Sequence, residues 1–171
     1  MIIVSSAEKA AESRRLVTPG GMVPEGSQNW RTSLVGPARR DLAEGAVMPG
    51  PGEFFPHAFL IEQPPNAQLR THFHSPYQFQ IVVGGSGTLG AHPIAYGSVH
   101  FTAPYTPYGP IKDAGEGVHY MTLRNGWDPG ASYMPESRDR LRAVPRSHRE
   151  KSFGPAPHLS EADLAATKEA L

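Results

Sequence analysis

The sequence predicts an all-β fold, a sandwich or barrel of short antiparallel strands. From residue 54 to residue 124, short extended runs alternate with turns rich in glycine and proline, a spacing typical of such folds. No helical period separates these runs, which argues against a doubly wound α/β fold. The 171 residues include 18 glycines and 18 prolines, as expected for a compact β-fold with many turns.

The expected strands of the middle region follow one another at short intervals. They are residues 54–63, 69–74, 79–83, 88–92, 98–102 and 118–124. The breaks between them are residues 64–66, 84–87, 93–97, 104–110 and 113–117. The break at 84–87 reads Gly-Gly-Ser-Gly, which predicts the turn of a hairpin.

The two ends of the chain differ from the middle. Residues 5–17 predict a short helix with Ser5 or Ser6 as its N-cap, because serine accepts hydrogen bonds from the first free amides. Residues 31–35 predict a first strand, and Ser160 predicts the start of a small C-terminal helix. The expected regions are an N-terminal extension of short helix, strand and loop (1–53), a barrel core (54–124) and a C-terminal arm with its helix (125–171).

Composition limits the classes of function. The formal charge is zero, so no overall field favours a nucleic acid or a membrane surface as a partner. The arginines between residues 138 and 149 are offset by neighbouring acids and predict a solvated arm or a partner contact. Cysteine is absent and neither a signal peptide nor a membrane-spanning run is visible, so we expect a cytoplasmic protein.

Residues 85–90, Gly-Ser-Gly-Thr-Leu-Gly, match a dinucleotide-binding pattern. Such a site needs a helix that begins there, so that its N-terminus faces the pyrophosphate. The next residues, 91–97, are Ala-His-Pro-Ile-Ala-Tyr-Gly, which do not form that helix. We therefore predict a hairpin here and no nucleotide cofactor.

His72 and His74 are the strongest candidates for a functional site. Two residues apart on an extended segment, they project to the same side. Two neutral imidazoles on one face can bind a divalent metal. The alternative is an interior pair held by ordinary hydrogen bonds.

The spacing around these histidines resembles that of the cupin superfamily, whose members are small jelly-roll barrels. The family's first motif is G-x5-H-x-H-x3-4-E-x6-G, and His72, His74 and Gly85 match it in register. Gln78 stands where the family has its metal-binding Glu, and Asn66 where it has the leading Gly.

The resemblance covers about residues 54–124 and includes a second motif, G-x5-P-x-G-x2-H-x3-N. Gly97 matches its first glycine, and residues 102–108 look like the family's Ile-Pro-Pro-Gly-x-Pro-His corner. Tyr108 stands at the position of the family's metal-binding His. With the helices expected at both ends, this implies an all-β, cupin-like double-stranded β-helix with short N- and C-terminal helical extensions.

The resemblance implies a divalent transition metal, either zinc, nickel, iron or copper, held by His72, His74 and Gln78. Gln78 offers a carbonyl oxygen without the charge of Glu. Tyr108 either ligates the metal as a phenolate, which requires loss of its proton, or serves as a hydrogen-bond donor and acid/base catalyst toward a substrate.

Other polar side chains are candidates for a further ligand or a substrate contact if they face the barrel interior. They are His100, His119 and Gln80. The histidines expected at the surface are His57, His92, His148 and His158. The expected strands show neither a nucleophile triad nor a pair of carboxylates, which argues against protease-type and glycosidase-type chemistry.

Three kinds of function remain open. The first is a metal-dependent enzyme that acts on a small organic molecule by oxygenation, isomerisation or lyase chemistry. The second is a non-catalytic cupin that binds a small ligand as a sensor or carrier. The third is an interaction module, whose site would be too occluded for small molecules. By analogy with the fold, we also expect a homodimer.

Overall fold

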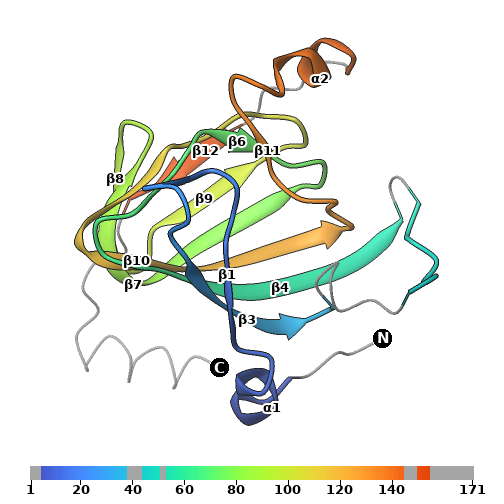
Figure 1. The fold of residues 1–171 in the computed structure, drawn as a ribbon, viewed down its shortest axis with the longest axis horizontal. Helices are drawn as coiled ribbons and strands as arrows, with labels where there is room; N and C mark the ends of the chain where they lie inside the picture. Colours follow the sequence, from blue (N-terminus) through green and yellow to red (C-terminus); the bar gives the residue numbers. More distant parts are fainter. Residues whose placement is uncertain (1–4, 38–43, 51–52, 145–149, 155–171) are drawn as a thin grey trace, which may run out of the picture.

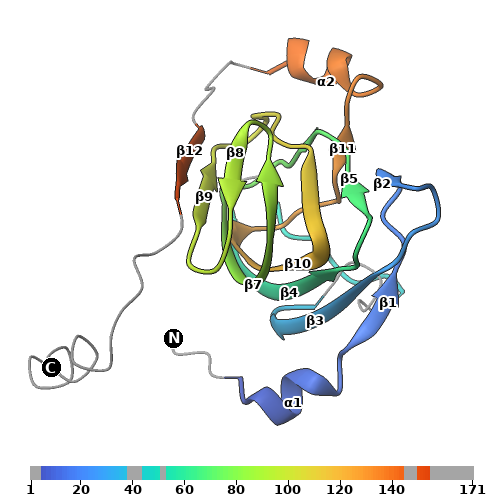
Figure 2. The ribbon, with the colours of Figure 1, turned by 90° about the vertical axis from the view of Figure 1, so that its left-hand side faces the viewer.

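The computed structural model shows a β barrel with two short helices outside it (Figures 1 and 2). It describes residues 5–37, 44–50, 53–144 and 150–154. The helices are α1 (Ala7–Ala11) and α2 (Arg138–Arg142). The strands are β1 (Arg15–Val17), β2 (Met22–Val23), β3 (Asn29–Val35), β4 (Phe54–Gln63), β5 (Gln68–Leu69), β6 (His72–Phe73), β7 (Gln78–Leu89), β8 (His92–Ile94), β9 (Val99–Thr102), β10 (Ile111–Gly126), β11 (Ser132–Tyr133) and β12 (Glu150–Phe153).

Two long strands, β7 and β10, connect the two walls of the barrel. One half of each lies in a wall with the strand order β1-β3-β4-β10-β7-β9-β12, and all its pairings are antiparallel. The other half of β10 pairs with β5, the other half of β7 pairs with β8, and β5 pairs with β2. Figure 2 shows the barrel that results. The predicted jelly-roll fold is confirmed.

Glycines allow β7 and β10 to bend where they pass between the walls, and the register of their pairing shifts twice there. Gly85 has a φ of +66°, and a Cβ atom on it would lie 2.1 Å from the carbonyl oxygen of Gly117. The turn expected at 84–87 is therefore wrong, because β7 continues through these residues and the turn follows at Gly90. The break expected at 113–117 is also wrong, because β10 continues through it.

Inward-facing residues alternate with outward-facing ones along the long strands. β7 buries Gln78, Gln80 and Val82, whereas Phe79 and Val83 are exposed. At one end of the barrel the inward rows are apolar. The core consists of Met22, Phe59, Ile61, Ala67, Leu69, Val82, Leu89, Ile94, Tyr108, Ile111, Val118 and Tyr120. At the other end the inward rows are polar, and the candidate site lies there.

The N-terminal segment adds strands to the barrel rather than one long helix. α1 ends at Ala11, and Ser6 caps it by accepting a hydrogen bond from the amide of Lys9 at 3.2 Å. The helix predicted over 5–17 is too long, because β1 pairs with β3. The helix predicted to begin at Ser160 lies outside the described residues. Neither described helix is long and apolar enough to cross a membrane.

We expect Gly87→Ala to destabilise the barrel by steric clash alone. A Cβ atom on Gly87 would lie 1.9 Å from the carbonyl oxygen of Lys112, a backbone atom of the paired strand. The strands must shift to relieve this clash, so the free energy of unfolding should fall by about 2 kcal/mol or more, measured by urea denaturation. Gly154→Ala is the control, because no described atom lies within 4 Å of its Cβ position. Equal unfolding midpoints for the two variants would contradict the expectation.

Candidate functional site

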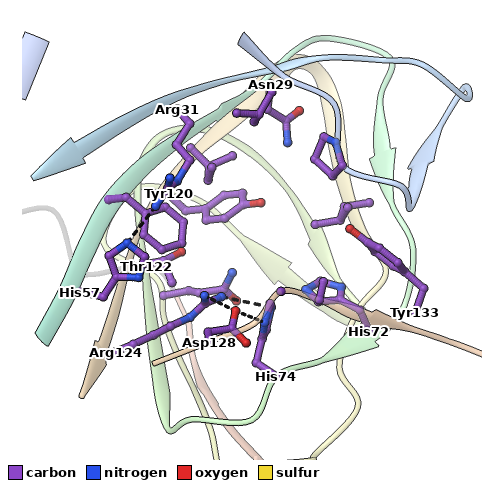
Figure 3. Close-up of a pocket in the computed structure, with 18 of the residues that line it drawn as sticks. Asn29, Arg31, His57, His72, His74, Tyr120, Thr122, Arg124, Asp128 and Tyr133 are labelled. Atoms are coloured by element: carbon purple, nitrogen blue, oxygen red, sulfur yellow. Dashed lines mark hydrogen bonds and ion pairs between the residues drawn. The ribbon is translucent and has the colours of Figure 1, made fainter. Parts of the chain in front are cut away.

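A cavity of about 300 Å³ lies at the polar end of the barrel (Figure 3). Its polar lining comes from several strands and from the segment that follows β10. These residues are Asn29, Arg31, His57, His72, His74, Gln80, Tyr108, Tyr120, Thr122, Arg124, Asp128 and Tyr133. The remaining wall is mostly apolar, and this combination is typical of a small-molecule site.

The two histidines of the predicted pair both line this cavity. His72 in β6 and His74 just after it are buried, and their ring centroids are 5.1 Å apart. Phe73 between them packs instead against Tyr105, as strand alternation requires. His72 and Tyr108 exchange two backbone hydrogen bonds of 3.0 and 3.1 Å. The structure therefore brings the histidine pair and Tyr108 together.

Hydrogen bonds fix the orientation of His72 and Tyr108. The Nδ1–H of His72 donates to the carbonyl oxygen of Arg70 at 2.7 Å, so Nε2 is the acceptor of the neutral ring. The hydroxyl of Tyr108 donates to this Nε2 at 2.9 Å and accepts a hydrogen bond from the amide nitrogen of Gln78 at 2.6 Å. These hydrogen bonds therefore define which atoms of His72, Tyr108 and Gln78 donate and which accept.

Arg124 is the centre of the hydrogen-bond network. Its Nε and one terminal nitrogen donate to the side-chain oxygen of Gln78 at 2.8 and 2.7 Å. Its other terminal nitrogen donates to Asp128 at 2.5 Å. The nitrogen that reaches Gln78 also donates to Nε2 of His74 at 3.2 Å. One cation thus holds three other side chains, and Figure 3 shows Arg124, Asp128 and His74 together on one side of the cavity.

His74 and Asp128 form a charge-assisted pair in the cavity wall. The Nδ1–H of His74 donates to the carboxylate at 2.8 Å, which leaves Nε2 as the acceptor. Burial lowers the pKa of His74 and Arg124 lowers it further, although Asp128 opposes both effects. Burial alone would raise the pKa of Asp128, but Arg124 and His74 hold that pKa well below its usual range. At neutral pH the carboxylate is therefore ionised and the imidazole is neutral.

Burial also keeps His72 and Tyr108 neutral. It lowers the pKa of His72 to about 3, and the neighbouring His74 adds to the effect. It raises the pKa of Tyr108 well above the value of an exposed phenol. The neutral phenol of Tyr108 donates a hydrogen bond to Nε2 of His72, which agrees with the interpretation of Tyr108 as a hydrogen-bond donor.

The three further candidates occupy different places. Gln80 lines the cavity, and its side-chain oxygen accepts a hydrogen bond from Nδ1–H of His100 at 3.1 Å. His100 is buried beside Tyr108, with ring centroids 4.9 Å apart, but it does not line this cavity. His119 alternates in β10 with the inward-facing Tyr120 and is only half-buried. His119 does not line this cavity, and its contact with a metal or substrate stays a prediction.

Several polar residues of the cavity were not expected from the sequence, among them His57, Arg31, Arg124 and Asp128. His57, which was expected at the surface, is buried, and its Nε2 lies 2.9 Å from a terminal nitrogen of Arg31. Strand parity is the signal that points to Arg124, because it alternates in step with the inward-facing Tyr120. Asp128 lies beyond the expected barrel core, where no periodic pattern points to it.

The chain resembles solved structures that share this barrel. The polyketide cyclase RemF from Streptomyces resistomycificus matches with a TM-score of 0.55 and 17% identity, over 83% of this chain and 92% of the cyclase. An oxalate decarboxylase from Lactobacillus farciminis matches with a TM-score of 0.51 and 12% identity, over 85% of this chain but only 39% of that one. A cupin-2 domain protein from Rhodospirillum rubrum matches with a TM-score of 0.48 and 13% identity, over 77% of this chain and 82% of that one.

The chain has the cupin fold. This agrees with the resemblance expected from the first histidine motif. At 12% to 17% identity the likeness concerns the fold alone. A scan against models of known protein families finds no match, and neither does a search of curated proteins.

The donor atoms that a metal in this cupin barrel would need are already engaged. Nε2 of His72 accepts a hydrogen bond from Tyr108. Nε2 of His74 and the oxygen of Gln78 both accept hydrogen bonds from Arg124. Within the part of the chain that the structure describes, no three histidine, cysteine, aspartate or glutamate side chains form a group that could hold a metal ion. The zinc, nickel, iron or copper ion expected on His72, His74 and Gln78 does not fit the side chains as they stand.

We expect the stability of the protein to fall in mild acid because of the buried histidines. In the unfolded chain His72 titrates near 6.5, whereas in the folded protein burial lowers its pKa to about 3. Below pH 6.5 the unfolded state therefore binds a proton that the folded state does not. The free energy of unfolding should decrease as the pH falls from about 6.5 toward 3, by up to about 1.4 kcal/mol per pH unit for this one group.

Urea denaturation between pH 7.5 and pH 5.5 measures this slope, because carboxylates such as Asp128 begin to titrate in the unfolded chain only below about pH 5. His72→Gln removes the titrating group and should give a shallower slope than the wild type. The exposed His92→Gln is the matched control and should keep the wild-type slope. Identical slopes for wild type and His72→Gln would show that this histidine does not link folding to protons.

Proposed function

We propose that this barrel is an enzyme that moves a proton on a small carbonyl compound. The observation that carries the proposal is the 3.2 Å contact between Nε2 of His74 and the guanidinium of Arg124, both in the cavity wall. A neutral base and a fixed positive charge lie side by side. This arrangement suits the formation of an enolate, because the base removes a proton and the charge stabilises the oxygen anion that develops.

His74 is the proposed general base. Its Nε2 carries a lone pair, and Asp128 accepts the hydrogen bond from Nδ1 that fixes this tautomer. A carboxylate in that position also stabilises the imidazolium that forms when Nε2 takes a proton. The bond from Arg124 to Nε2 is the longest in the network that surrounds Arg124. A substrate oxygen can therefore take over this donor at small cost.

Arg124 is the proposed group that binds the oxygen anion. Its side chain is only 8% exposed, and its bonds to Gln78 and Asp128 hold it in place before any substrate arrives. A preorganised charge in a site with little water stabilises a developing negative charge more strongly than a mobile charge in water.

The proposed step conserves atoms and charge. Nε2 of His74 takes a proton from the carbon next to the substrate carbonyl. The C–H electron pair forms a carbon–carbon double bond, and the carbonyl pair moves onto the oxygen beside Arg124. The imidazolium then returns its proton either to another carbon, which isomerises the substrate, or to an alkoxide formed when the enolate attacks a second carbonyl, which closes a ring.

Tyr108 acts in this proposal as a positioning residue. Its hydroxyl is bonded on both sides, to His72 and to Gln78. Gln78 in turn accepts two bonds from Arg124. Tyr108 therefore orients the guanidinium through Gln78, and its loss should cost less activity than the loss of His74.

The comparison with RemF supports the ring-closing version of this step. RemF is a polyketide cyclase, and the shared barrel covers 92% of it. A cavity of about 300 Å³ also suits a small molecule better than a partner protein, which argues against the interaction module. A barrel that binds a small ligand without turnover remains the alternative, favoured by the low pKa of His72 and His74, since such imidazoles are weak bases.

Deuterium exchange separates the enzyme from the ligand-binding alternative. The protein is incubated in D₂O with aryl ketones and 1,3-dicarbonyl compounds small enough for the cavity, and NMR follows the loss of the proton next to the carbonyl. We expect the wild type to accelerate exchange for at least one of these compounds. His74→Gln should lower the rate by about 100-fold or more, the usual contribution of a general base.

Three further variants make this test specific. Asp128→Asn should also slow the exchange, and Tyr108→Phe should slow it less than His74→Gln does. His92→Gln, on the exposed surface, should leave the rate unchanged. A wild type that accelerates no exchange, or a His74→Gln variant as fast as the wild type, would favour the ligand-binding barrel, and circular dichroism confirms that each variant is folded.

A further inference from the structure

The side chains at the metal-ligand positions of the cupin motifs converge on one small space. The Tyr108 hydroxyl lies 2.9 Å from Nε2 of His72 and 2.6 Å from the amide nitrogen of Gln78. A terminal nitrogen of Arg124 lies 2.7 Å from the oxygen of Gln78 and 3.2 Å from Nε2 of His74. The four side chains are those of His72, His74, Gln78 and Tyr108. The phenol of Tyr108 and the guanidinium of Arg124 therefore fill the space in which these side chains meet.

We infer that the guanidinium of Arg124 takes the place of a metal ion in this barrel and supplies the positive charge that binds the substrate oxygen. This inference deepens the proposed function, since it names the group that replaces the metal in that same site. Two of these four side chains already accept hydrogen bonds from Arg124 through the lone pair that would bind a metal ion. They are His74, through its nitrogen, and Gln78, through its oxygen.

The charges of the site agree with this replacement. A divalent ion beside Arg124 would meet a buried cation, and like charges repel strongly at low dielectric. Gln78 is neutral where the motif has a carboxylate, so it accepts bonds from Arg124 without adding a second negative charge to that of Asp128. Arg124 and Asp128 carry opposite charges and are bonded to each other, which leaves the network neutral overall.

The two histidines of the motif still lie together in the cavity wall. His72 and His74 lie on the same side of the chain, with ring centroids 5.1 Å apart. What prevents metal binding is therefore the guanidinium together with the two changed positions, Gln78 and Tyr108. Removing the guanidinium and changing these two positions should create a metal site on the existing backbone.

Cobalt(II) is a suitable probe, because its visible absorption reports protein ligands directly. The purified wild type, titrated with cobalt(II) chloride, should show no saturable visible band. The variant Gln78→Glu/Tyr108→His, which keeps Arg124, should also show none. Adding Arg124→Ala to these two changes should raise the affinity for cobalt(II) by about 100-fold or more and give a band at one equivalent.

Two variants control this result. Arg142→Ala, added to Gln78→Glu/Tyr108→His, removes an arginine whose side chain is 68% exposed. This change should not create a cobalt(II) site. His72→Ala, added to the variant that binds cobalt(II), should abolish the band. If Arg124→Ala fails to fold because the carboxylate of Asp128 loses its cation, adding Asp128→Asn removes that charge as well.

Two results would overturn the inference. One is a wild type that binds about one equivalent of cobalt(II) in a way that His72→Ala abolishes. The other is a folded variant without Arg124 that binds cobalt(II) no better than its counterpart with Arg124. Both results come from measurements of metal affinity. The proposed reaction is tested separately, by the deuterium exchange experiment.

Discussion

The buried guanidinium of Arg124 is the constraint on which the rest of the site depends. An isolated charge in a protein interior costs several kcal/mol unless opposite charge and hydrogen-bond acceptors surround it. Asp128 supplies the charge, Gln78 accepts two hydrogen bonds, and His74 accepts another. These partners come from β7, from the residue after β6 and from the segment after β10. One cation thus holds together parts of the chain that are far apart in sequence.

The same cation contributes to the protonation states around it. Burial lowers the pKa of His74 and Arg124 lowers it further, whereas Arg124 and His74 hold the pKa of Asp128 below its usual range. At neutral pH, His74 is therefore a neutral base and Asp128 a carboxylate. The charge of Arg124 makes His74 a weaker base, but the same charge stabilises an anion that forms beside the guanidinium. When a developing oxygen anion binds Arg124, the lower basicity of His74 and the stabilisation of the anion therefore affect the same proton transfer. The pair is therefore suited to acids whose conjugate base is an oxygen anion.

Periodicity in the sequence predicts the features that are local. Alternation along a strand is enough to place His72 and His74 on one face, and the motif spacing is enough to place Tyr108 near them. The prediction of a turn at 84–87 is wrong because the glycines there allow a close approach to the backbone of Gly117 and Lys112. No local sequence pattern reveals these contacts. Strand parity places Arg124 with the inward-facing Tyr120, but a charged residue at the end of a strand usually faces solvent, so parity alone does not predict its burial. Its burial depends on Asp128, which lies outside the periodic region.

A guanidinium and a metal ion offer different chemistry even when they fill the same space. A metal ion binds oxygen through coordination and changes its ligand number during a reaction. Arg124 instead offers a constant charge and hydrogen bonds in a fixed plane, and three of its nitrogen atoms are already engaged by Gln78 and Asp128. The contact that remains exchangeable is the long one to His74. In the proposed mechanism, the direction of that contact would point a substrate oxygen toward His74, so the guanidinium would also select the proton that is moved.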